Sequence, residues 1–73
     1  MGVVGLDDRF REVAFDFIRS KYGDCTIEIS HIFEYGGSVE VSGVFKRVGE
    51  RSLRRFTLKI ERDSLNVKGF GLR

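Results

Sequence analysis

The chain contains no proline and no tryptophan, and it has one cysteine and one histidine among 73 residues. A single cysteine excludes an internal disulfide, so Cys25 is expected to be a reduced thiol that faces the core. The same scarcity leaves no cluster of metal ligands and no convincing Cys-His or Ser-His-Asp set. The sequence therefore predicts a non-enzymatic protein with no catalytic residue, no metal site and no cofactor.

Long apolar runs are also missing. The apolar start of the chain is too short for a signal peptide, and no later run approaches the length of a membrane span. We expect one domain over residues 1 to 73, located in the cytosol. A domain of this size buries only about 60% of its unfolded surface, so association with a partner would add stability.

Residues 8 to 22 carry the helical period of the chain, with apolar residues three and four positions apart. Asp7 or Asp8 is expected to cap the helix, and Gly23 to take the left-handed conformation that ends it at Tyr22. Phe15 and Tyr22 lie on the flank of the apolar stripe, where either a strongly curved sheet or a second subunit covers them. The stripe consists of Phe10, Val13, Ala14, Phe17 and Ile18.

Four strands are expected after the helix, over residues 25 to 35, 38 to 47, 52 to 61 and 64 to 72. Gly36-Gly37 permits a tight reversal between the first two strands. Gly43 predicts a kink within the second, and a change of inward parity at Gly69 predicts a bulge in the fourth. In the first strand, alternation assigns to the inner face Cys25, Ile27, Ile29, His31, Phe33 and Tyr35.

Short connections make consecutive strands neighbours, which predicts an antiparallel meander in the order 1-2-3-4. The expected fold class is α+β, with the N-terminal helix packed across one face of the four-stranded sheet. This order of elements resembles the helix-grip arrangement of the cystatin and monellin folds. The resemblance is architectural and covers most of the chain.

Cystatins inhibit proteases through an N-terminal glycine, a Gln-x-Val-x-Gly hairpin loop and usually a Pro-Trp pair. Gly2 and Gly5 correspond to the first feature, and Val41 and Gly43 match only the Val and Gly of the second. Those two residues fall inside a predicted strand, and the chain has no Pro-Trp pair. The resemblance therefore implies a fold and not an inhibitory function.

Charge is distributed unevenly along the chain. Residues 1 to 45 carry 4 basic and 8 acidic side chains, or −4, whereas residues 46 to 73 carry 9 basic and 3 acidic side chains, or +6. Basic residues on the outer face of strands 2 to 4 could follow a phosphate backbone. Against this hypothesis, Glu40 is expected opposite Lys59, and no exposed aromatic residue is expected among the basic ones. The possible nucleic-acid contacts are Lys46, Arg47, Arg54, Arg55, Lys59 and Lys68.

The function that the sequence favours is binding to a protein partner or to a second copy, most simply as a homodimer. Apolar residues on the helix flank and on the outer sheet face suggest the interface. Two alternatives stay open, nucleic-acid binding by the basic sheet face and small-ligand binding between helix and sheet. The predicted partner or self-association interface consists of Phe15, Tyr22, Ile32, Val44 and Leu53.

Overall fold

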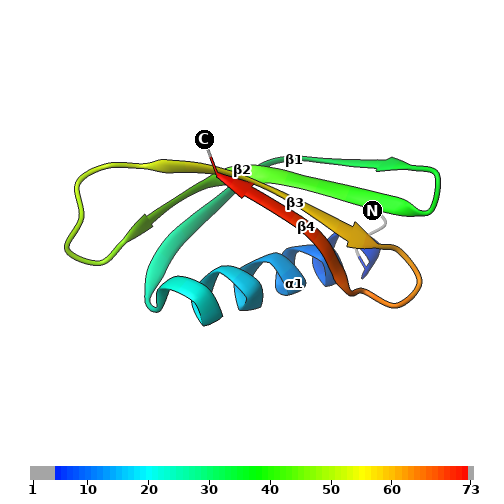
Figure 1. Ribbon diagram of the computed structural model, residues 1–73, viewed down its shortest axis with the longest axis horizontal. Coiled ribbons are helices and arrows are strands. Elements are labelled where there is room, and N and C mark those ends of the chain that lie inside the picture. Colours follow the sequence, from blue (N-terminus) through cyan, green and yellow to red (C-terminus); the bar gives the residue numbers. More distant parts are fainter. Residues whose placement is uncertain (1–4, 73) are drawn as a thin grey trace.

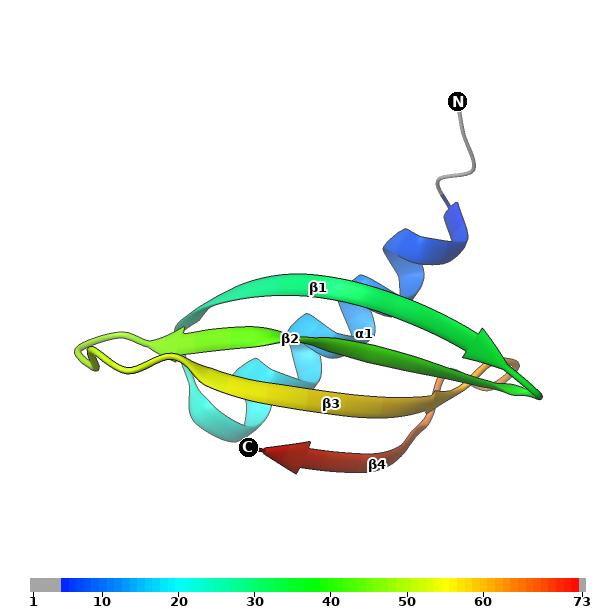
Figure 2. The same cartoon turned by 90° about the horizontal axis from the view of Figure 1, so that it is seen from above.

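The computed structural model describes residues 5–72, with side chains from residue 8 onward. Helix α1 (Gly5–Tyr22) is followed by β1 (Cys25–Tyr35), β2 (Ser38–Arg47), β3 (Arg54–Glu61) and β4 (Val67–Leu72). The strands form one antiparallel sheet in the order β1-β2-β3-β4. Figure 1 shows α1 lying across one face of this sheet, and Figure 2 shows that it crosses the strands obliquely. The predicted α+β architecture is confirmed.

The face of the sheet that α1 covers is termed the inner face, and the opposite one the outer face. Apolar side chains from the helix stripe and from alternate positions of the central strands meet on the inner face, because side chains alternate between the two faces of a strand. Val13 and Phe17 of the helix stripe are half-buried against this core. The buried residues of this core are Phe10, Ala14, Ile18, Cys25, Val39, Val41, Phe45, Phe56, Leu58 and Ile60.

The helix ends where the sequence predicts but starts earlier. Gly23 has a φ of 84°, and its N–H donates to the carbonyl of Arg19 at 2.8 Å, so the helix ends at Tyr22. Its start at Gly5 places Asp7 and Asp8 inside the helix, which corrects the prediction that one of them is the cap. Carboxylates are also favourable in a first helical turn, because the backbone N–H groups there have no helical partner.

β3 and β4 begin two and three residues later than predicted. For β4 the reason is that the turn before it is longer than two residues. The N–H of Glu61 donates to the carbonyl of Asn66 at 2.8 Å and closes this turn. Leu65 takes a left-handed φ of 63° within it and packs against the core. Ser64 Oγ donates to the Glu61 carboxylate at 2.7 Å. The predicted inward orientation of Leu65 is confirmed, although it precedes the strand.

The register of β1 against β2 shifts between Ile29 and His31. Before the shift Ile29 lies opposite Gly43, and after it Ile32 lies opposite the buried Val41. Ser30 is therefore an extra residue that reverses the alternation of the strand. The prediction of an unbroken alternation is wrong beyond this point, since Ile32 now faces the core, whereas three other side chains face outward: His31, Phe33 and Tyr35.

Gly43 explains why the irregularity occurs at this place. A Cβ atom on Gly43 would lie 2.3 Å from the carbonyl oxygen of Glu28 and 3.0 Å from the Cα atom of Ile29. The backbones of β1 and β2 approach too closely for any side chain at this position. The sequence predicts a kink at Gly43 itself, in β2, whereas the register shift lies in β1, the strand opposite. The predicted irregularity at Gly69 is confirmed, because Gly69 pairs with Lys59 whereas Val67 pairs with Ile60, which leaves Lys68 as the extra residue.

Candidate functional site

Three ring-bearing side chains of β1 form what we term the aromatic ridge, consisting of His31, Phe33 and Tyr35. They occupy alternate positions and therefore share the outer face. Phe33 is 56% exposed and Tyr35 48% exposed, and the rings of His31 and Phe33 have centroids 4.9 Å apart. Sequence reasoning missed this ridge. The available signal was Ser30-His31, two polar residues in succession in an otherwise alternating strand.

The ridge contacts charged residues on the neighbouring strands. Glu40 lies opposite Lys59 as predicted, yet the structure records no ion pair between them among the described residues. Lys59 Nζ lies 5.9 Å from the ring centroid of Tyr35, a distance at which cation and ring attract. The Tyr35 hydroxyl donates to Glu40 Oε1 at 3.3 Å. Tyr35 thus connects a basic and an acidic side chain on the outer face.

The six basic residues proposed from the sequence separate into two groups. Arg47 and Arg54 lie at the β2–β3 end of the sheet, where both pair with the Glu50 carboxylate at 3.4 and 3.7 Å. The other group lies on the outer face, and its member Arg55 is in no ion pair with a described residue. Lys68 reaches this face through its Nζ, which donates to Ser38 Oγ at 3.3 Å. The outer-face group consists of Lys46, Arg55, Lys59 and Lys68.

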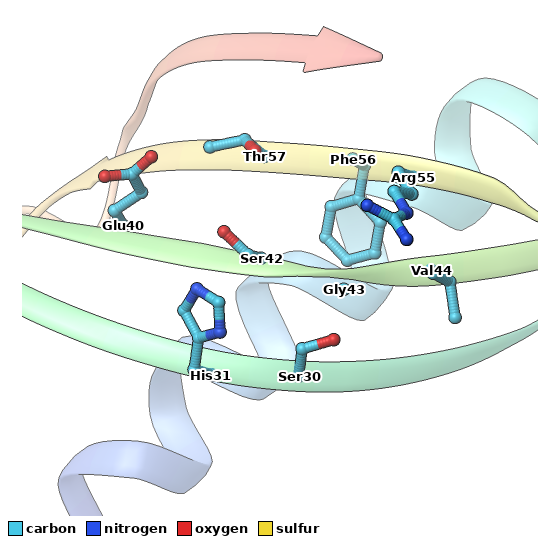
Figure 3. A pocket seen from close by; sticks show the side chains of 9 residues that line it. All are labelled: Ser30, His31, Glu40, Ser42, Gly43, Val44, Arg55, Phe56 and Thr57. Atoms are coloured by element: carbon cyan, nitrogen blue, oxygen red, sulfur yellow. The ribbon is translucent and has the colours of Figure 1, made fainter. Parts of the chain in front are cut away.

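A hollow of about 440 Å³ opens on the outer face across β1, β2 and β3. Figure 3 shows Glu40 at one end and Arg55 at the other, with Ser42 and Thr57 between them. On β1 the hollow is flanked by Ser30, the extra residue of the register shift, and by His31, which follows it. The remaining lining comes from Gly43, Val44 and Phe56. The hollow is therefore polar, with hydroxyl groups between a carboxylate and a guanidinium.

The five residues predicted as a partner interface do not share one surface. Tyr22 is half-buried and packs against the core, with its ring centroid 4.9 Å from that of Phe45. Ile32 faces the core opposite Val41. The sheet of the same chain therefore covers Tyr22, and the assignment of Ile32 to the outer face is wrong because of the register shift. The others lie in three separate places: Phe15 half-buried on α1, Val44 in the hollow and Leu53 in the β2–β3 connection.

Aromatic rings fill the space between helix and sheet, the place where the sequence leaves small-ligand binding open. Phe10, Phe45 and Phe56 are each no more than 2% exposed. Phe17 and Phe70 pack with ring centroids 5.0 Å apart. A ligand bound there would have to displace these rings, whereas the polar hollow lies on the opposite face.

Some other features that the sequence raised can be placed. Cys25 is a free, buried cysteine, as predicted. Within residues 5–72 no group of His, Cys, Asp and Glu side chains is arranged to hold a metal ion. No helix in that range is both long and apolar enough to cross a bilayer. Of the cystatin-like positions, Gly2 lies outside the described residues, Gly5 begins α1, and Val41 and Gly43 lie within β2.

A scan of protein-family models, a search of curated proteins and a search of solved structures each find no match to this chain. The assignment of a function therefore depends on the chemistry of the outer face.

Proposed function

We propose that this protein binds single-stranded nucleic acid on the outer face of its sheet. The observation that carries the proposal is the register shift at Ser30, which turns the aromatic ridge onto the face that carries Arg55 and Lys59. The absence of exposed aromatic residues is one of the two arguments that the sequence offers against this function. That argument no longer holds, because Phe33 and Tyr35 are about half exposed.

The division of roles follows from the chemistry of nucleotides. Exposed rings offer stacking surfaces for unpaired bases, and basic side chains neutralise phosphates. The ridge on β1 and the basic residues on β3 are separated by two strand spacings, or about 10 Å. One strand can therefore place its bases on the ridge while its phosphates contact β3. A duplex would gain less, because its bases are already stacked on one another.

The size of the effect can be estimated for each part of the site. Stacking contributes about 1–3 kcal/mol per base, so replacing two ridge residues by alanine should weaken binding by at least about thirtyfold. If three or four of the outer-face basic residues contact phosphates, the logarithm of affinity should fall against the logarithm of salt with a slope of about −2 to −3. The outer face also carries Glu28, Glu40 and Glu61, which keeps the expected affinity moderate.

Fluorescence anisotropy with labelled single-stranded and duplex oligonucleotides tests the proposal. The double variant F33A/Y35A should bind the single strand at least about thirtyfold more weakly. The matched control is V48A/L53A, which removes exposed apolar side chains from the connection at the other end of the sheet. No binding at low salt, or equal binding by the two double variants, would contradict the proposal.

A charge reversal tests the basic part separately. The variant R55E/K59E should abolish binding at moderate salt, whereas R9E/R11E, which reverses two exposed charges on α1, should have a much smaller effect. Equal losses in both variants would indicate a nonspecific charge effect and would count against a site on the outer face.

Self-association is a second candidate, favoured by the position of β1. Within the described residues β1 pairs only with β2, so its other edge has open backbone groups beside the exposed Phe33 and Tyr35. Pairing of two β1 edges would join two sheets and bury part of both ridges. Sedimentation equilibrium separates the candidates: a dimer that F33A/Y35A dissociates supports this one, and a monomer at micromolar concentration rejects it.

A further inference from the structure

We infer that the hollow on the outer face is a subsite for one guanine base of the bound strand. This inference rests on the proposed function and adds a base preference to it. The argument uses the chemistry at the two ends of the hollow, which differ in charge, and the hydroxyl groups that lie between them.

The two ends of the hollow complement two different edges of a base. Glu40 offers a carboxylate, which accepts hydrogen bonds, and Arg55 offers a guanidinium, which donates two in parallel. Guanine has two adjacent N–H donors, at N1 and N2, and two adjacent acceptors, O6 and N7. Adenine, cytosine and thymine each lack one of these paired sets. Guanine is therefore the base that can satisfy both ends at once.

Neither end is already occupied by an ion pair within the described part of the chain. Glu40 and Arg55 take part in none of the recorded ion pairs, although other arginines on the same strands do. The Tyr35 hydroxyl donates to Oε1 of Glu40 at 3.3 Å and so helps to orient the carboxylate. A donor edge presented to Glu40 would complete its hydrogen bonding.

The position of the hollow suits a base rather than a phosphate. A phosphate beside Glu40 would meet a like charge, whereas a neutral base with separate donor and acceptor edges meets none. The small side chains of Ser42 and Thr57 leave room between the two ends (Figure 3). His31 belongs both to the lining and to the aromatic ridge, so a base in the hollow is adjacent to bases stacked on Phe33.

The test uses a labelled oligothymidylate in which one central position is varied, with binding measured by anisotropy. The oligonucleotide with guanine should bind about tenfold or more tightly than those with adenine, cytosine or thymine. Hypoxanthine, which lacks the N2 amine, and 7-deazaguanine, which lacks N7, should each lose most of this preference. Free guanosine monophosphate should compete poorly, because it cannot also occupy the ridge.

Two variants assign the preference to its residues. E40Q should remove the preference for guanine over hypoxanthine and retain binding of plain oligothymidylate. The control is E28Q, which changes another acidic residue of the outer face that lies outside the hollow, and it should leave the preference intact. R55K retains the charge but not the paired donors. This variant should bind the guanine and 7-deazaguanine oligonucleotides equally well, and the salt dependence of its binding should be unchanged. Circular dichroism is the control that checks whether each variant is folded.

The outcomes separate this inference from the proposed function. Equal affinity for all four bases, or preference for another base, overturns the guanine subsite and leaves strand binding standing. No binding of any oligonucleotide overturns both. If guanosine monophosphate binds as tightly as the oligonucleotide, the hollow is a mononucleotide site and the inference of a strand subsite is overturned.

Discussion

Replacing Gly43 by alanine tests the feature that places the aromatic ridge on the outer face. The new Cβ atom would lie 2.3 Å from the carbonyl oxygen of Glu28 and 3.0 Å from the Cα atom of Ile29. Both neighbours belong to the backbone, so no change of rotamer relieves the overlap and β1 must move away from β2. We expect the variant to be less stable and its β1 pairing to be disturbed.

The magnitude follows from two opposing effects. Forcing an extra carbon into a packed site costs about 1–3 kcal/mol, and replacing glycine lowers the freedom of the unfolded chain, which returns about 0.4–1 kcal/mol. The middle of each range gives a net loss of about 1.3 kcal/mol, which should lower Tm by roughly 5–10 °C in a domain of this size. Thermal unfolding followed by circular dichroism measures the shift.

Gly71 provides a matched control for Gly43. A Cβ atom there would meet nothing within 4 Å, and Gly71 is not among the glycines with positive φ. Gly71→Ala should therefore leave stability unchanged or raise it by a few tenths of a kcal/mol. If Gly43→Ala is as stable as the unmodified protein, or if both variants lose the same stability, the explanation of the register shift is refuted.

Two further predictions concern the core and the surface. Phe10 is 1% exposed, so Phe10→Ala should lower the free energy of unfolding by about 3–5 kcal/mol. That is a large part of the roughly 4–11 kcal/mol expected for a chain of this length. Urea unfolding measures the loss, and a value below about 1 kcal/mol would contradict the assigned core. Arg62 pairs with Glu34 near the first hairpin, and the two side chains are 51% and 41% exposed. Arg62→Ala should therefore change the free energy of unfolding by less than about 1 kcal/mol. A larger loss in the same assay would show that this ion pair contributes more than a solvent-exposed one does.

The sequence predicts the architecture because its signals are local and repeated. Apolar residues recur at helical spacing from Phe10 to Ile18, and buried and more exposed residues alternate several times in β2 and β3. Gly23 marks the end of the helix. Positions near turns are less predictable, because the left-handed Leu65 lengthens a connection that the sequence suggests is short.

The candidate site could not be predicted in the same way. One extra residue, Ser30, reverses the orientation of every later side chain in β1. It directly follows Glu28 and Ile29, the residues whose backbone lies close to Gly43 on the neighbouring strand. The sequence suggests that Gly43 is unusual but does not show which strand responds. The basic residues were easier to assign, since Lys46, Arg55 and Lys59 occupy regular positions of strands whose alternation is unbroken.

Chemical-shift mapping by NMR tests most directly the claim that the outer face binds a single strand. An isotope-labelled sample is titrated with a short single-stranded oligonucleotide, and amide shifts are followed along the chain. We predict that the largest changes occur around Phe33, Tyr35, Ser42 and Thr57, with little change on the exposed side of α1. Shifts confined to α1 or to the β2–β3 connection, or no shifts at all, would contradict the account.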